Sequence, residues 1–191
     1  MSVVDFEQLT DESLVLIIVQ EGKTELYQVI YNRYYPKLLD KCYALLKNKQ
    51  LAHESSQDIL TKVYEKLQSF KGLSSFSSWI YSITYNYCID YLRSNKKLHY
   101  PDWNNSHELS EIIDEADENL NELRYDRLMK IMEKIHPEEK AMLIMKYSDN
   151  ISMKQIAEAL RISESAAKMR IKRAKARIAY QYKKMYYDID N

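Results

Sequence analysis

The chain has 191 residues, enough for one large or two small domains, and 46% of them are hydrophobic, which excludes global disorder. Glycine occurs twice and proline three times, too few for the turns of a sheet-rich fold, so the composition predicts an all-α protein. The formal net charge is zero, but nine acidic residues lie within 101–127 and nine basic residues within 161–184.

Apolar residues at helical spacing predict five helices in the first half of the chain. We expect them at residues 10–20, 24–35, 36–47, 52–70 and 77–97. Thr10 or Asp11 can cap the first helix and Gly22 can end it, while Pro36 suits the first turn of the third. The one irregular stretch of this half is 70–76, which contains the second glycine, Gly72.

The helix expected at 77–97 has two interpretations. Trp79 falls on an apolar stripe at helical spacing, and the basic residues near the end of this helix suit the helix dipole. Alternatively, Trp79, Tyr85 and Asn86 form an aromatic and polar face that Arg93 continues, a combination suited to single-stranded nucleic acid. The composition of the helix leaves both interpretations open.

The acidic residues gather between two predicted domains. Residues 99–121 combine many acids with few apolar side chains, so we expect an acidic flexible linker there. It joins two helical domains, 1–98 and 122–191. In the second domain we expect helices at 121–135 and 137–147, the latter with a proline and acids in its first turn.

The caps and the apolar spacing within residues 151–179 predict two helices joined by a tight turn. Ser152 and Gln155 have the spacing of a capping box at the start of the first helix, and Ser163 can cap the second. Arg161 opens the turn, where glycine is usual because the residue takes a positive φ, so a side chain there costs about 1 kcal/mol. The inward positions are Ile156, Ala157, Leu160, Ala167, Ile171, Ala174 and Ile178.

The second of these helices is strongly basic. Its other faces carry Lys168, Arg170, Lys172, Arg173, Lys175 and Arg177, and we expect Met169 and Ala176 to point away from the apolar arc as well. This spacing is typical of a DNA-binding helix-turn-helix, whose exposed cations suit a phosphate backbone. The alternative is an amphipathic hairpin with a solvated basic face.

No metal site or cofactor is expected. Cys42 and Cys88 belong to no CxxC motif, and the four histidines show no metal-ligand spacing. We expect both cysteines to be small buried groups in a reducing cytoplasm. No N-terminal signal is visible, and the apolar run 14–19 is too short for membrane insertion, so we expect a cytoplasmic protein.

Both halves together resemble a known family. In the first half the resemblance rests on QDILTKVY at 57–64, Phe70, FSSWI at 76–80, and then Asn86, Asp90, Leu92 and Arg93. In the second half it rests on the run from His136 to Ile178. The chain resembles a bacterial sigma-70 family factor of the extracytoplasmic-function group. It departs from the family at Leu60, where Phe is frequent, at Arg161, and at Ala166 and Ala167, where Thr and Val are more usual.

The resemblance implies a promoter-specificity subunit that is not an enzyme, with core RNA polymerase and promoter DNA as partners and an anti-sigma factor as a further candidate. It implies that Gln57, Asp58 and Lys62 lie on the polymerase-binding helix. The resemblance also implies that seven residues face the melted minus-10 strand: Lys71, Gly72, Phe76, Trp79, Tyr85, Asn86 and Arg93. At the minus-35 element, the resemblance implies base contacts by Lys168, Met169, Lys172 and Arg173. It implies phosphate contacts by Arg170, Lys175 and Arg177.

Two other functions compete with this one. The first is a self-sufficient helix-turn-helix repressor or activator, which would bind duplex DNA tightly without the polymerase. The second is a nucleic-acid enzyme such as a recombinase, which needs a supported nucleophile or acids gathered around a metal. The carboxylates concentrate in the predicted linker and no tyrosine stands in a visible Arg/His cluster, so the enzyme is disfavoured.

Overall fold

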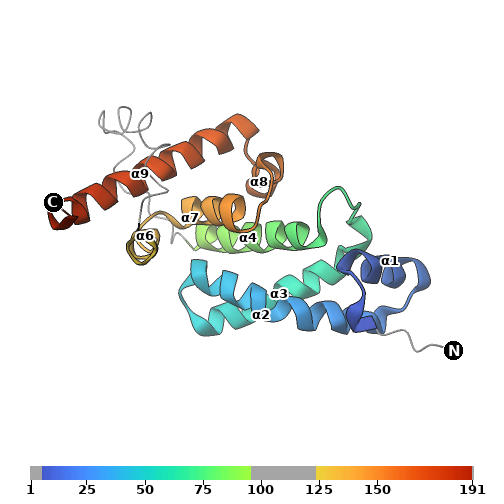
Figure 1. Ribbon diagram of the computed structural model, residues 1–191. Helices are drawn as coiled ribbons and strands as arrows, with labels where there is room; N and C mark the ends of the chain where they lie inside the picture. The colour runs from blue at the N-terminus through green and yellow to red at the C-terminus, as the bar shows by residue number, and fades with distance from the viewer. Residues whose placement is uncertain (1–5, 96–123, 191) are drawn as a thin grey trace. The chain divides into compact units, whose positions relative to one another are not determined.

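The computed structural model describes residues 6–95 and 124–190, with side chains up to 186, and within these ranges it contains helices and no strand. The all-α prediction is therefore confirmed. The chain divides into two compact units, Met1–Tyr91 and Leu92–Asn191 (Figure 1). The predicted linker at 99–121 lies outside the described residues, and its flexibility stays a prediction.

The first unit is built from four helices: α1 (Asp11–Glu21), α2 (Tyr27–Leu46), α3 (Lys49–Glu65) and α4 (Phe76–Ser94). Figure 1 shows α2 and α3 side by side, and only two residues, 47–48, connect them. The core contains fully buried side chains from all four helices, among them Leu14, Ile30, Leu38, Ile59, Leu60, Ile80 and Ile89. Each such side chain contributes about 1.5–3 kcal/mol when it leaves water.

Short-range polar contacts fix the ends of these helices. The Thr10 hydroxyl accepts a hydrogen bond from the Ser13 N–H at 3.2 Å, and Gly22 ends α1 with a φ of 69°, both as predicted. Asn48 caps α3 by accepting the Leu51 N–H at 2.9 Å. This cap starts α3 three residues before the expected position, and α3 ends at Glu65 rather than continuing to residue 70.

The prediction of separate helices at 24–35 and 36–47 is wrong, because Pro36 lies inside the continuous helix α2. A proline within a helix costs about 3 kcal/mol, since it removes one backbone hydrogen bond and its ring crowds the preceding turn. Here the buried stripe continues on both sides of it, through Tyr34 and Leu38. Pro36 has no N–H to donate to the backbone carbonyl of Asn32. Both residues are exposed, so water can solvate that carbonyl instead.

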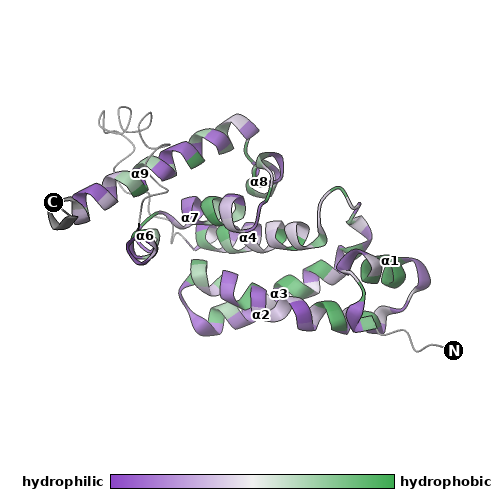
Figure 2. Ribbon diagram, in the orientation of Figure 1, coloured by the Kyte–Doolittle hydropathy of each residue, from purple (hydrophilic) through white to green (hydrophobic). Residues whose placement is uncertain are grey.

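The second unit contains α6 (Tyr125–Met132), α7 (Pro137–Leu143), a π-helical turn at Ile144–Ser148, α8 (Met153–Leu160) and the long α9 (Glu164–Asp190). Its core is formed by side chains from each of these elements, including Ile131, Met142, Met145, Ile156, Leu160 and Ile171. The helix α9 packs against α6, α7 and α8. Hydrophilic and hydrophobic bands alternate along α9, as expected of an amphipathic helix (Figure 2).

Candidate nucleic-acid interface

The predicted helix-turn-helix is present as α8 and the start of α9. The capping box of α8 is complete, because the Ser152 hydroxyl accepts the Gln155 N–H at 3.3 Å and the side-chain carboxamide oxygen of Gln155 accepts the Ser152 N–H at 3.1 Å. Arg161 ends α8 in the left-handed conformation, with φ 56° and ψ 46°. Ser163 caps α9 by accepting the Ala166 N–H at 3.1 Å. Local sequence signals thus fix both helices and the turn between them.

The inward face of α9 is also as predicted. Ala167, Ile171, Ala174 and Ile178 are all buried. On α8 they are matched by Ile156, Leu160 and the small Ala157, which are buried as well. The packing of these two stripes holds the first turns of α9 at a fixed angle to α8, with the opposite face of α9 turned to solvent.

That solvent face carries the residues expected to contact DNA bases. Lys168, Met169 and Arg173 are exposed, Met169 with 47% of its surface accessible, and Lys172 is partly exposed. Lys168 forms an exposed ion pair with Glu164 one turn earlier, at 2.8 Å, which water screens and a phosphate can replace. These side chains lie in the first three turns of α9, the part of a recognition helix that usually contacts base edges.

Two arginines of α9 are instead paired with acids of α7. Arg170 donates to the Glu138 carboxylate at 3.0 Å, and Arg177 donates to the Glu139 carboxylate. Arg177 is only 7% exposed, which contradicts the expectation of a phosphate-facing side chain, and Ala176, expected to face the groove, is fully buried. The reason is that α9 packs against α6 and α7 as well as α8, so its buried arc is wider than the apolar stripe indicated.

The first turn of α7 has an unusual electrostatic environment. Burial raises the pKa of the Glu139 carboxyl above its usual value, although the Arg177 guanidinium acts in the opposite direction. Burial also lowers the pKa of His136, whose Nδ1 caps α7 by accepting the Glu138 N–H at 3.2 Å. Sequence reasoning assigned these acids to the helix dipole alone, because nothing local shows which distant arginines they meet.

In the first unit, the residues expected at the melted strand divide into two groups. Lys71 and Gly72 are exposed, and Gly72 has a φ of 67° that an ordinary side chain rarely adopts. Arg93, which falls in the second unit, is exposed as well, but it donates to the buried Glu138 carboxylate. Phe76 and Tyr85 are at most 1% exposed, which contradicts their placement on a DNA-facing surface. Both belong to the core of this unit, because their positions on α4 face inward rather than along the predicted polar face.

Trp79 packs against the core of the first unit but keeps part of its surface accessible. Its ring lies 5.4 Å from the Phe70 ring and 5.6 Å from the Phe76 ring, centroid to centroid, and the side chain is half-buried. Asn86 is half-buried too, and its carboxamide oxygen finds no hydrogen-bond donor among the described residues. That oxygen is itself buried, so a nucleic-acid base could reach it only after the surrounding side chains move.

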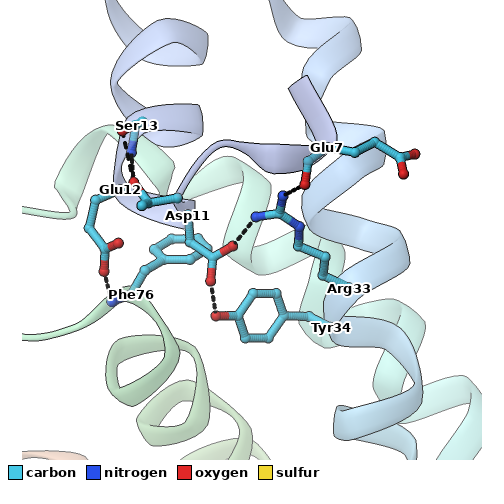
Figure 3. A network of polar contacts seen from close by, with 8 residues as sticks. Glu7, Asp11, Glu12, Ser13, Arg33, Tyr34 and Phe76 are labelled. Atoms are coloured by element: carbon cyan, nitrogen blue, oxygen red, sulfur yellow. Dashed lines mark hydrogen bonds and ion pairs between the residues drawn. The ribbon is translucent and has the colours of Figure 1, made fainter. Parts of the chain in front are cut away.

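Two acidic residues of α1 make polar contacts with α2 and α4 that sequence reasoning did not predict (Figure 3). The Glu12 carboxylate accepts the Phe76 N–H at 2.9 Å. Asp11 accepts hydrogen bonds from Arg33 at 2.6 Å and from the Tyr34 hydroxyl at 2.5 Å. Burial and the Asp11 hydrogen bond raise the pKa of Tyr34, so it stays a neutral donor. No local signal predicts contacts between residues this far apart in the sequence.

The three predicted polymerase-binding residues lie on the exposed face of α3. Gln57, Asp58 and Lys62 are all exposed. Tyr87 of α4, which sequence reasoning did not connect to them, donates its hydroxyl to Asp58 at 2.8 Å. The Lys62 ammonium lies 4.6 Å from the centre of the same ring. Burial and Asp58 raise the pKa of Tyr87 to about 12. Tyr87 therefore stays a neutral phenol, and its hydroxyl holds the Asp58 carboxylate in place.

Two further observations concern the described residues as a whole. Within 6–95 and 124–190, no three His, Cys, Asp or Glu side chains gather as metal ligands would. None of the helices in these ranges has the length and apolarity that crossing a bilayer requires.

Comparison with known protein families supports the sequence-based identification. Residues 30–98 match the model of Sigma-70 region 2, and residues 125–178 match that of Sigma-70 region 4. The two matches occur in the order expected and together span more than half of the chain. The chain belongs to the sigma-70 family.

Relatives of this sigma factor point to the extracytoplasmic-function group. It is 28% identical to the ECF RNA polymerase sigma factor SigW of Bacillus subtilis, over 85% of this chain and 92% of that one. It is 27% identical to the ECF RNA polymerase sigma-E factor of Haemophilus influenzae, over 90% and 95% of the two chains. The sigma factor described here therefore directs promoter-specific transcription, and a self-sufficient repressor or activator is not favoured.

A solved structure shares the fold of this sigma factor. The sigma factor RpoE of Bartonella quintana, in complex with the anti-sigma factor NepR, aligns with a TM-score of 0.55 at 17% identity. The alignment covers 90% of this chain and 99% of RpoE. At this identity the match supports the fold and not the roles of single residues.

Proposed function

We propose that this sigma factor binds core RNA polymerase through the exposed face of α3, with Gln57, Asp58 and Lys62 as its polar contacts. These side chains lie on the face of α3 opposite its buried stripe. The Tyr87 contact holds Asp58 and Lys62 in place before binding, which lowers the entropy lost when the complex forms.

The minus-10 contact surface proposed for the first unit is smaller than the sequence suggested. It consists of the loop 71–75, in which Ser74 is partly exposed and the other residues are exposed. Lys71 supplies positive charge to this surface. Arg93 is left out because it lies in the second unit and pairs with Glu138, and Asn86 is left out because its carboxamide oxygen is buried. Phe76, Trp79 and Tyr85 support this surface by packing beneath it rather than by contacting bases.

The minus-35 contact surface proposed for the second unit is the solvent face of α9. The observation that carries this proposal is the exposure of Lys168, Met169 and Arg173 on the second helix of a complete helix-turn-helix. Lys172 joins them as a base contact, and Lys175 is placed for phosphate. Arg170 is paired with Glu138 and only partly exposed, so its phosphate contact requires that this pair open.

In vitro transcription with cognate core polymerase tests the whole proposal. Adding the full chain should give initiation at a subset of genomic promoters, and changing Lys168 and Arg173 together to Ala should abolish it. The matched control changes Lys183 and Lys184, equally exposed near the end of α9, and should leave initiation intact. Tight, specific binding to duplex promoter DNA without polymerase would instead support a self-sufficient regulator. An anti-sigma factor remains a candidate partner, since RpoE of Bartonella quintana was solved with one.

A further inference from the structure

Two cysteines that are 46 positions apart in the sequence meet in the core of the first unit. Cys42 comes from α2 and Cys88 from α4, and neither has any exposed surface. The Cys88 thiol donates to the Cys42 sulfur, with 3.7 Å between the two sulfur atoms. This separation is van der Waals contact between thiols, so no other side chain lies between them.

We propose that Cys42 and Cys88 form a reversible disulfide site, closed by a hydroperoxide and reopened by a dithiol reductant. A disulfide requires the sulfurs to approach from 3.7 Å to about 2.05 Å, through rotation of the two side chains and adjustment of the backbone. The proposal rests on the contact between the two thiols and does not depend on the polymerase or DNA surfaces.

The chemistry balances with the hydroperoxide as oxidant. The Cys42 thiolate attacks the terminal oxygen, the O–O bond breaks, and an alcohol or water leaves as Cys42 becomes a sulfenic acid. Cys88 then attacks that sulfur, the S–S bond forms, and hydroxide leaves with the Cys88 proton as water. Two thiols lose two electrons and the hydroperoxide gains them.

The roles of the two cysteines follow from their hydrogen bond. The S–H of Cys88 stabilises a thiolate at Cys42, which lowers the pKa of Cys42, whereas Cys88, as the donor, has a raised pKa. Cys42 is therefore the attacking group and Cys88 the resolving one. Because both are buried, the reaction must wait for local opening of the first unit, so it should be slow and should speed up in mild denaturant.

The disulfide would tie α2 to α4 and close a loop that contains the whole of α3. Crosslinking across a loop of this length restricts the unfolded chain and stabilises the folded one. Oxidation should therefore raise the thermal midpoint of the first unit, by on the order of 10 °C. The sigma factor would then exist in two redox states that differ in the rigidity of the helices carrying its proposed contacts.

The test uses the full chain treated with hydrogen peroxide and then with dithiothreitol. Intact mass should fall by two hydrogen atoms, both cysteines should resist alkylation in denaturant, and dithiothreitol should reverse both changes along with the rise in midpoint. Cys42→Ala and Cys88→Ala, each a small change in volume, should show neither the mass loss nor the rise. Oxygen addition to a single cysteine, disulfide-linked dimers, or unchanged thiols at the point where methionines are oxidised would overturn the proposal.

Discussion

The pairing of Arg177 with Glu139 predicts a large and specific loss of stability when one partner is removed. Replacing Arg177 with Met keeps much of its aliphatic packing but leaves the Glu139 carboxylate buried without its partner. Breaking a buried ion pair in this way costs about 3–5 kcal/mol. That is a large share of the roughly 5–15 kcal/mol that keeps a domain folded.

The pKa of Glu139 indicates how the pair should respond when both partners change. Burial raises that pKa even with Arg177 alongside, so the cost of removing the carboxylate from water exceeds the attraction within the pair. Arg177→Met combined with Glu139→Leu should therefore recover most of the lost stability, because neither buried charge remains.

Native-state hydrogen exchange measures this in the second unit without interference from the first. Slow amides of α9, such as Ile171 and Ala174, should exchange about a hundred- to a few thousand-fold faster in Arg177→Met. The matched control, Arg173→Met, removes an exposed cation and should change exchange less than about twofold. If Arg177→Met behaves like this control, or if the double variant is as unstable as the single one, the buried-pair reasoning is refuted.

Four further outcomes are expected. Arg173→Ala should relax base preference at one minus-35 position by about 1–3 kcal/mol in a promoter-selection assay, whereas uniform weakening of all promoters would make Arg173 a phosphate contact. Changing Gln57 and Asp58 together to Ala should weaken assembly with core polymerase with an unchanged circular dichroism spectrum, and full assembly would remove them from the interface. Glu12→Gln keeps an acceptor for the Phe76 N–H and should preserve the rate of promoter melting monitored by permanganate, whereas Glu12→Ala should slow it. Equal melting rates for the two variants would mean that Glu12 does not support loop 71–75. Because burial lowers the pKa of His136 below its usual 6.5, the unfolded chain binds more protons as the pH falls through that value, so the second unit should lose stability on acidification. His136→Asn does not titrate and should flatten the stability curve around pH 6, and an unchanged curve would exclude His136 as the source.

The parts of the fold that sequence reasoning predicted well are those set by neighbours in the chain. The capping box at Ser152 and the 3.6-residue spacing of α8 and α9 act within one or two turns, so they can be recognised without the rest of the molecule. The left-handed Arg161 was expected for the same reason, since the turn requires it whatever residue stands there.

The predictions that failed depended on contacts between elements distant in sequence. Pro36 was expected to start a helix, but the buried stripe of α2 outweighs its local cost. In the sequence, nothing distinguishes Arg177 from the other cations of this basic helix. In the folded unit, α7 brings Glu139 beside it. Tyr85 was assigned to a polar face although α4 is packed on more than one side, and only the assembled unit shows which side is covered. The spacing of apolar residues shows where the buried face of a helix is centred but not how wide that face is.

The loop 71–75 shows how the first unit can present an exposed surface on a rigid support. Leu73 is 91% exposed, so the middle of the loop makes almost no contact with the unit. Its two ends are fixed, because the Phe70 and Phe76 rings meet at 5.2 Å and Glu12 holds the first turn of α4. A short loop between fixed ends has few conformations to lose on binding, and the positive φ of Gly72 lets it turn without strain. We therefore expect the contacts of α1 to affect DNA melting, even though α1 itself carries none of the proposed DNA-binding residues.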